Sequence, residues 1–503
     1  MRFSRTGLSH AVLVGGAILL VAVFILAVGG PYYTRIEDYR DLGELRVATR
    51  VDALAYSQGE DGVYAGYEHD LLVALGERLG VPVRFILYPD TAHALEAVIN
   101  GQAHLAAAGL TRDNRLPLAW TTEIREIDFI LVGRTGRRGL LRERDLAGRV
   151  VTVRPGGRLA NTVEAIRKRV PKLQTISPAS NADDQALLMQ VAAGQIDLLA
   201  TDQVHYELAK RYAPNLAIVY DLPLKSTVSW ALPPQPNSYL AGEINAFLIE
   251  ANNNGLFART ADRYFGHIRR LDRYDIAVFQ TRIQKRLPRY IPYFREAAAR
   301  VGIDWRYLAA VSYQESHWDP EATSYTGVRG MMMLTVDTAN RLGIEDRLNP
   351  QQAIQGGARY LSMLQKKLPK EVPYPDNMWM TTASYNIGLG GLNNARALAR
   401  QLGKNDASWV DLKSVLPLLS QPKYAGQFKT GPVRGGEALI MSENVRNFYD
   451  ILRRAYPNEP LIESRAKAPA ATVAAPGMQT NALRTTPQRA AHISGVNTST
   501  PPM

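Results

Sequence analysis

The pattern of hydrophobic residues changes once along this chain, and the change separates two kinds of fold. From about Leu45 to Ile268, short apolar runs alternate with helical stretches, which predicts an α/β domain with mainly parallel sheets. From about Arg282 to Tyr456, helical periodicity dominates, which predicts a mainly α-helical domain. The expected strands are Leu45–Thr49, Val83–Leu87, His104–Ala108, Phe129–Val132, Val150–Val153 and Ile196–Ala200.

The chain has 503 residues, a length that fits several domains. Its last segment, 464–503, has no acidic or aromatic residue, so it cannot bury enough apolar surface to fold and is expected to be disordered. The expected organisation is a signal peptide or membrane anchor over 1–30, an α/β domain over 40–269, a polar connector over 270–285, a helical domain over 286–456 and the tail.

The amino terminus has the pattern of an export signal. Arg2 and Arg5 precede an uncharged apolar run over 11–29. That run is also long enough to span a bilayer, and Pro31 disfavours cleavage after the small residues before it. A cleaved signal and a retained inner-membrane anchor therefore both stay open. In either case the residues after about 30 are expected outside the cytoplasm.

The composition excludes several classes of site and partner. Cysteine is absent, so disulfides, thiolate zinc sites, cysteine nucleophiles and iron–sulfur clusters are excluded. The net charge of +12 suits an acidic partner such as nucleic acid, anionic lipid or an acidic wall polymer. Because an exported chain rarely meets nucleic acid, we expect no nucleic-acid partner.

Local patterns in the α/β part suggest a ligand site. The Gly156-Gly157 turn runs from a predicted strand into a helix and directs free backbone N–H groups toward an anion. Arg115 can form a fork onto a carboxylate, and Asp202 follows a predicted strand at the edge where open α/β sheets bind ligands. The alternative is that these are surface charges on a retained scaffold. The candidate ligand-binding residues are Asp70, Arg115, Gly156, Gly157 and Asp202.

The order of these elements resembles the bacterial extracellular solute-binding proteins that capture polar amino acids. The resemblance covers about residues 44–268. It implies that Arg115 and the turn at Gly156–Arg158 hold a ligand carboxylate and that Asp202 holds its ammonium group. The implied ligand is a small amino acid or muropeptide.

One carboxylate stands out in the helical part. Glu315 follows Leu308 and Val311 at helical spacing, so it lies on the apolar stripe of its own helix. Desolvation there raises the pKa of a carboxyl group, which is what a general acid requires near neutral pH. The alternative is a core-edge glutamate paired with an arginine.

Further motifs follow Glu315-Ser316 in order: Gly327–Thr335, Thr382–Gly388 and a late Glu443-Asn444-Val445. Over about residues 286–456 the chain resembles the lysozyme-like lytic transglycosylases of the soluble-transglycosylase type. Met333 at a position usually held by Gln, with the solute-binding pattern ahead, makes it similar to the membrane-bound lytic murein transglycosylase F subfamily. The resemblance implies a catalytic Glu315 and a substrate-binding set of Ser316, Met332, Met333, Tyr385 and Asn386.

This resemblance implies a peptidoglycan lytic transglycosylase, a carbon–oxygen lyase that needs neither cofactor nor metal. Its partners would be peptidoglycan glycan strands, cleaved without water to give 1,6-anhydromuramic acid ends during cell wall turnover and remodelling. The implied location is the periplasmic side of a Gram-negative envelope, at the periphery of the outer membrane. Met441 stands where a late Tyr is expected. That departure leaves open the alternative that the chain is a catalytically weak or silent sensor that binds the cell wall or an amino acid. Tyr424 or Tyr449 could instead take the place of the expected tyrosine.

Overall fold

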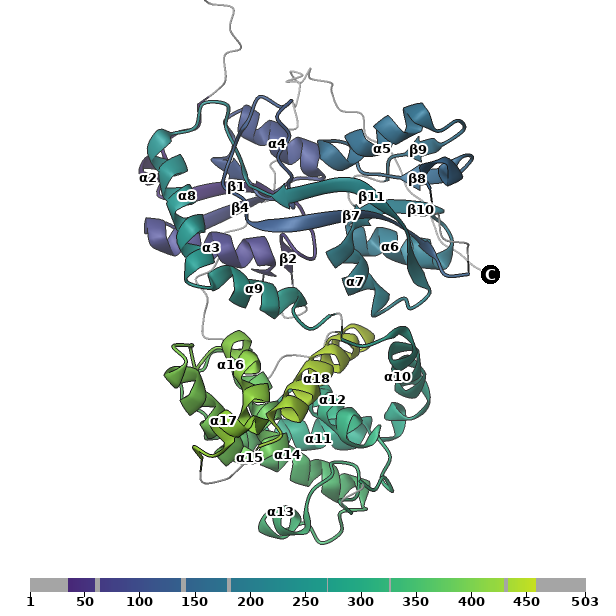
Figure 1. Cartoon of the computed structure of the whole chain (residues 1–503), viewed down its shortest axis with the longest axis vertical. Helices are drawn as coiled ribbons and strands as arrows, with labels where there is room; N and C mark the ends of the chain where they lie inside the picture. The colour runs from purple at the N-terminus through teal and green to yellow at the C-terminus, as the bar shows by residue number, and fades with distance from the viewer. Residues whose placement is uncertain are drawn as a thin grey trace, which may run out of the picture.

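The computed structural model contains an α/β part and a helical part, drawn one above the other in Figure 1. The predicted amino-terminal segment 1–30 and the tail 464–503 lie outside the described residues. None of the helices within the described residues is long and apolar enough to cross a membrane. The structure describes residues 35–58, 64–136, 142–178, 182–268, 270–324, 327–428 and 433–457.

The α/β part is built from two lobes, each around its own five-stranded sheet. Lobe 1 comprises the described residues of 35–124 and 229–268, and lobe 2 those of 125–228. The sheet of lobe 1 is parallel across its first three strands, and the last two strands are joined antiparallel. In spatial order its strands are β4 (Val83–Leu87), β1 (Leu45–Thr49), β5 (Leu105–Ala106), β12 (Ala231–Leu232) and β6 (Ala119–Trp120).

Lobe 2 contains the two long strands that join the lobes. Its spatial order is β11 (Leu216–Val228), β7 (Arg125–Arg134), β10 (Leu198–Asp202), β8 (Val150–Thr152) and β9 (Gln174–Ile176). The strand β7 runs antiparallel to both of its neighbours, whereas β10, β8 and β9 are parallel. Arg125 pairs with Val228, so the two crossings between the lobes lie side by side. The hinge of the α/β part is therefore this pair of strand ends.

Helices cover the sheets of both lobes (Figure 1). Side-chain caps begin several of them. Asp90 accepts a hydrogen bond from the N–H of His93, and Asp183 accepts one from the N–H of Ala186. A short strand pair within lobe 1, β2 (Ser57–Gln58) with β3 (Tyr64–Ala65), forms a separate two-stranded sheet. The helices are α2 (Tyr39–Leu42), α3 (Tyr67–Leu79), α4 (Thr91–Ile99), α5 (Gly157–Arg169), α6 (Asp184–Ala193), α7 (Gln203–Lys210), α8 (Ser238–Asn253) and α9 (Leu256–Phe265), with the 3-10 turn η1 (Glu143–Leu146).

The helical part is arranged around α12 (Trp305–Ser316). Ten of the twelve residues of α12 are buried, and Asp304 caps its first turn by accepting from the N–H of Arg306. The other elements are α10 (Arg273–Lys285), α11 (Ile291–Val301), α13 (Val336–Arg341), α14 (Pro350–Lys366), α15 (Asp376–Gln401), α16 (Trp409–Val415), α17 (Pro422–Ala425) and α18 (Gly435–Ala455), with the 3-10 turns η2 (Leu287–Arg289) and η3 (Leu416–Ser420).

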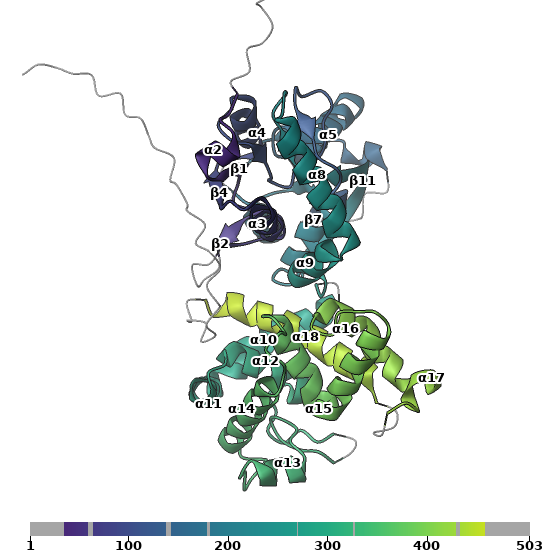
Figure 2. The same cartoon turned by 90° about the vertical axis from the view of Figure 1, so that its left-hand side faces the viewer.

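A polar interface joins the two parts, where α9 faces α16 and α18 (Figure 2). Asp262 on α9 binds Lys413 and also accepts from Arg446 at 3.0 Å. Asp450 on α18 binds Arg211 at 2.7 Å and His267 at 2.6 Å. The last helix of the described residues therefore contacts both parts of the molecule.

Candidate functional site

Glu315 lies one residue before the end of α12 and is half-buried. Burial alone raises the pKa of its carboxyl group from 4.5 to about 8. Among the described residues, no charged group adds to that shift and no side chain forms a hydrogen bond or ion pair with Glu315. The carboxyl group is thus largely protonated at neutral pH and free to donate its proton outward.

The loop that follows α12 is attached to it through hydrogen bonds from two serine hydroxyl groups. The hydroxyl groups of Ser312 and Ser316 both donate to the carbonyl of Met331, at 3.0 and 2.8 Å. Ser316 is buried, so this contact fixes the loop beside Glu315. Gly330 has a φ of +96°, and a Cβ there would lie 2.1 Å from the carbonyl oxygen of Arg347. This position therefore requires glycine.

The two methionines of the predicted substrate-binding set differ in exposure. Met332 is fully buried, and its side chain occupies the space beside Gly357, where an added Cβ would come within 2.4 Å of its Cε. Met333 has a left-handed φ of +45° and keeps part of its side chain exposed. Only Met333 of the pair presents side-chain surface to solvent.

Tyr385 and Asn386 lie near the middle of α15. The hydroxyl of Tyr385 donates to the carbonyl of Met332 at 2.7 Å. Burial and the neighbouring Glu315 raise the pKa of Tyr385 well above its ordinary value, so the phenol stays protonated. Asn386 is exposed, two residues before Gly388, whose φ of 74° and ψ of 162° interrupt the helix. The structure thus brings Glu315, Ser316, Met332 and Tyr385 together and leaves Asn386 on the adjoining surface.

Met441 lies on α18, where it is 4% exposed and part of the hydrophobic core. Of the two tyrosines considered as its substitutes, Tyr449 is buried and donates its hydroxyl to Asp304 at 2.8 Å. Tyr424 on α17 packs against the outside of the core. Tyr360, half-buried on α14, is nearer the site, because its ring lies 5.2 Å from that of Tyr385.

A separate cleft lies between the lobes of the α/β part and holds about 100 Å³ of free volume. Of the five predicted ligand-binding residues, Gly156, Gly157 and Asp202 line it. Arg115 does not; its side chain is 62% exposed and pairs with Asp113. Asp70 also lies outside the lining and faces α9, where it binds Arg263 and Tyr264.

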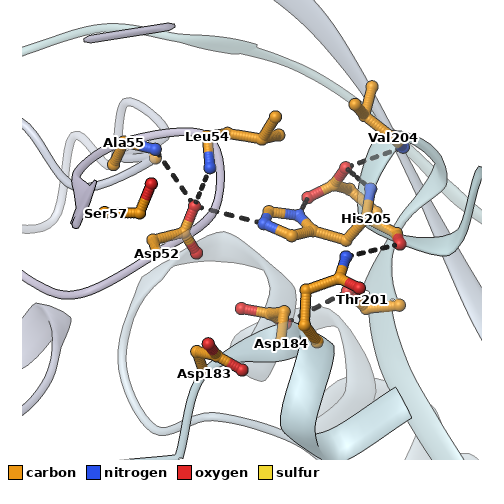
Figure 3. Close-up of polar contacts among 12 residues, drawn as sticks. Asp52, Leu54, Ala55, Ser57, Asp183, Asp184, Thr201, Val204 and His205 are labelled. Carbon is orange, nitrogen blue, oxygen red and sulfur yellow. Dashed lines mark hydrogen bonds and ion pairs between the residues drawn. The ribbon is translucent and has the colours of Figure 1, made fainter. Parts of the chain in front are cut away.

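Ion pairs cross this cleft from one lobe to the other. Arg50, just after β1, binds Asp184 of lobe 2 at 3.1 Å as well as Asp52 of its own lobe at 2.7 Å. His205 of lobe 2 lies between Asp202 at 2.5 Å and Asp52 at 3.2 Å, as Figure 3 shows for the Asp52 contact. Burial disfavours a charged imidazole, but the surrounding aspartates outweigh it and raise the pKa of His205 well above 6.5.

The charges of this cluster balance. With Arg154, which binds Asp184 at 3.2 Å, Arg50 and protonated His205 give three cations against three aspartates. The ligand atoms of Asp52, Asp184 and His205 lie within 4.8 Å of one another, a spacing that can suit a metal ion. Because the Arg50 guanidinium already lies between the two aspartates, we interpret the cluster as an ion-pair network.

Most of the residues that line this cleft were not predicted from the sequence. Arg50 directly follows a predicted strand, and the position after a parallel strand was the signal that could have found it. Asp184 and His205 carry no local signal, because they enter the site only through the packing of α6 and α7. Glu68 also lines the cleft and is 3% exposed.

Comparison with known proteins matches both parts. The family described as bacterial extracellular solute-binding proteins, family 3, matches residues 45–267, and the transglycosylase SLT domain matches residues 292–408. A "Membrane-bound lytic murein transglycosylase F" of Thiobacillus denitrificans is 38% identical over 84% of this chain and 90% of its own. A relative from Alkalilimnicola ehrlichii, named "Membrane-bound lytic murein transglycosylase F 1", is 37% identical over 84% of this chain and 85% of its own. The chain belongs to the membrane-bound lytic murein transglycosylase F family.

Membership in the transglycosylase F family confirms the predicted order of a solute-binding-protein-like α/β part and a helical transglycosylase part. The solute-binding match covers the lobes that form the cleft, and the transglycosylase match covers α12 with Glu315. Among solved structures, an ancestral arginine-binding protein bound to arginine has 22% identity and a TM-score of 0.41 over 44% of this chain and 98% of its own. A mutant of ArgBP from T. maritima has 17% identity and a TM-score of 0.41 over 45% of this chain and 97% of its own.

Proposed function

We propose that this chain cleaves the β-1,4 bond between N-acetylmuramic acid and N-acetylglucosamine in peptidoglycan without water, with Glu315 as the only acid and base. Family membership gives the class of activity, a peptidoglycan lytic transglycosylase. The observation that supports the finer mechanism is the isolation of Glu315: its pKa of about 8 is set by burial alone among the described residues. A hydrolase with two carboxylates would need a second acid beside it.

The chemistry follows from one carboxyl group in two protonation states. Protonated Glu315 gives its proton to the glycosidic oxygen, and the bond from that oxygen to the muramyl C1 breaks. The substrate's own acetamido group or an oxocarbenium-like state carries the positive charge that develops. Ionised Glu315 then takes the proton of the muramyl 6-hydroxyl, and that oxygen bonds to C1 to close a 1,6-anhydro ring. The carboxyl group is protonated again, so each turnover returns the enzyme to its starting state.

The residues around Glu315 support this reaction by fixing the loop and the wall beside it. Ser316 ties the loop to the catalytic helix through the Met331 carbonyl, and Tyr385 ties α15 to the same loop through the Met332 carbonyl. We propose that Met333 and Asn386, which keep exposed surface, contact the sugar directly. Ser316, Met332 and Tyr385 would position those contacts.

Product analysis tests the mechanism. The purified protein is incubated with peptidoglycan in water enriched in ¹⁸O. The products are then separated, and their masses are measured by mass spectrometry. Anhydro products, lighter by one water than reducing-end products and without solvent oxygen, are expected. Glu315→Gln should abolish them, whereas Glu321→Gln, an exposed glutamate in the next turn, should release them at the wild-type rate. Reducing ends that carry ¹⁸O would reject the proposal.

We also propose that the cleft of the α/β part binds a small zwitterion, such as an amino acid or a wall-derived peptide. The support is a cleft of about 100 Å³ between two lobes, lined by charges of both signs. The names of the relatives support a place in the envelope, and we propose that both parts act on its periplasmic side, where the wall lies.

A further inference from the structure

Two sets of polar groups in the lining of the cleft differ in their hydrogen bonding. Those of the ion-pair network largely satisfy one another, although the Nε of Arg50 has no partner among the described residues. Asp202, for example, accepts from the N–H groups of Val204 and His205 and from the His205 ring. A bound ammonium would have to displace one of these contacts. Most of the acceptor capacity of the aspartate expected to hold a ligand is therefore already used within the protein.

The second set, Glu68, Trp120 and Arg125, has unmet hydrogen-bonding capacity. Glu68 is 3% exposed; its Oε2 accepts from the N–H of Gly109 at 2.9 Å, and its Oε1 has no partner among the described residues. The indole N–H of Trp120 is likewise buried and unpartnered within the described parts of the chain. A buried polar group left without a partner is costly, so native proteins retain few of them without a ligand or water.

Arg125 completes this set with a positive charge. Of the arginines that line the cleft, Arg50 and Arg154 are paired with aspartates, and Arg158 donates to the Ser226 hydroxyl at 3.1 Å. Within the described chain the Arg125 side chain forms no ion pair, and its one hydrogen bond is a long 3.4 Å contact to the carbonyl of Glu126. Arg125 is half-buried and lines the cleft at the first residue of β7, on the hinge between the lobes. Its charge is felt by both Glu68 and Asp202.

We propose that Glu68, Trp120 and Arg125 form the ligand subsite of this cleft, and that Arg115 and Asp202 do not contact the ligand. Arg125 and the Trp120 indole donate to a carboxylate, while Glu68 accepts from an ammonium or other N–H donor. The ligand therefore lies against lobe 1 and the hinge, away from the ion-pair network. This assignment rests on the proposed binding of a small zwitterion and names the residues that perform it.

Glu68 gives the proposal a signature that a structural residue would not show. Burial raises the pKa of Glu68 to about 7, so the group is partly protonated near neutral pH. An ammonium placed against its free oxygen favours the ionised form. Binding should therefore release protons near pH 7, and the measured binding heat should depend on the ionisation enthalpy of the buffer.

The test is titration calorimetry on the full chain in detergent. The probes are the common L-amino acids and D-alanyl-D-alanine, first screened by thermal shift. For the probe that binds best, Glu68→Gln, Trp120→Phe and Arg125→Gln should each raise Kd about tenfold or more. Arg115→Gln, the same substitution at an exposed arginine ten positions earlier, should change Kd less than about twofold.

The outcomes separate the two levels of the proposal. If no probe binds the wild type, the proposed binding of a small zwitterion fails and this assignment fails with it. A different result would refute only the assignment of the subsite residues. In that case a probe binds, Arg115→Gln or Asp202→Asn weakens its binding, and Arg125→Gln and Trp120→Phe do not. The proposed binding of a small zwitterion would then still hold. Proton release that persists in Glu68→Gln would also refute the assignment. Trp120→Phe removes the N–H together with the five-membered ring of the indole, so its thermal midpoint is compared with that of the wild type to show that the fold is intact.

Discussion

Replacing Glu315, the proposed catalytic acid, should make the helical part more stable while removing its activity. In Glu315→Gln the side chain keeps its shape but can no longer ionise. Burial raises the pKa of Glu315 to about 8, which means that the folded protein disfavours the charged form. The wild-type chain is therefore less stable at any pH where the carboxyl group is ionised in the unfolded state. The Glu315→Gln variant has no such loss, because its amide does not ionise.

The size and sign of this stability difference follow from the different proton binding of the folded and unfolded chains. Below pH 4.5, the ordinary pKa, the group is protonated in both states and contributes nothing. Between 4.5 and about 8 the unfolded chain releases the proton and the folded chain keeps it, so stability falls by about 1.4 kcal/mol per pH unit. At pH 7 this amounts to about 3 kcal/mol as an upper bound. Because Glu315 keeps some solvent contact, about 1–3 kcal/mol is expected.

The assay is urea unfolding of wild type, Glu315→Gln and the exposed control Glu321→Gln, at pH 5 and pH 7.5. Four of the six tryptophans lie in the helical part, so their fluorescence reports mainly on it. Glu315→Gln should exceed wild type by less than about 1 kcal/mol at pH 5 and by more at pH 7.5. A gap of equal size at both pH values, or a less stable Glu315→Gln, would show that Glu315 is not desolvated in the folded state.

Three further substitutions test the packing that supports the site. Tyr385→Phe removes the hydrogen bond to Met332; we expect a stability loss of about 1 kcal/mol and a fall of about tenfold or more in wall digestion, measured by dye release. Gly357→Ala places a Cβ 2.4 Å from Met332 and should cost about 1–3 kcal/mol in urea unfolding, whereas Gly436→Ala, with open space in α18, should be neutral or stabilising. Asp450→Ala leaves the buried guanidinium of Arg211 without its carboxylate and His267 without its hydrogen-bond partner, so it should lower the thermal midpoint of the full chain, which scanning calorimetry would detect.

Local patterns predicted the elements whose residues are continuous in sequence. The strands at Leu45–Thr49 and Val83–Leu87 are confirmed residue for residue, because buried parallel strands read as short apolar runs. The strand β11 over Leu216–Val228 was missed. Its central residues alternate between buried and exposed, and its length comes from pairing with β7 along the hinge. Mainly parallel sheets were expected, and the antiparallel pairs of β7 were not.

The difference between local sequence patterns and contacts of distant segments also explains which site residues could be predicted. Helical spacing placed Glu315 on an apolar stripe, and its half-buried position agrees with that placement. The motifs that follow it, and not the spacing, favoured a catalytic role over a core-edge glutamate paired with an arginine. The ion-pair network of the cleft joins Arg50 to Asp184 across 134 residues, a contact that no local pattern encodes. Arg115 was chosen for its residue type after a strand, but Asp113, two residues before it, pairs with it outside the cleft.

The position of α18 constrains the order in which the molecule can assemble. This helix is the last element described, yet its Tyr449 reaches Asp304 across 145 residues and its Asp450 reaches Arg211 across 239. A chain made or exported from its amino terminus can complete both lobes of the α/β part before α18 exists. The helix that carries Glu315 cannot bury its face against α18 until residue 455 has emerged. Folding of the helical part therefore depends on contacts of long sequence separation, and its activity should appear only once residue 455 has been delivered.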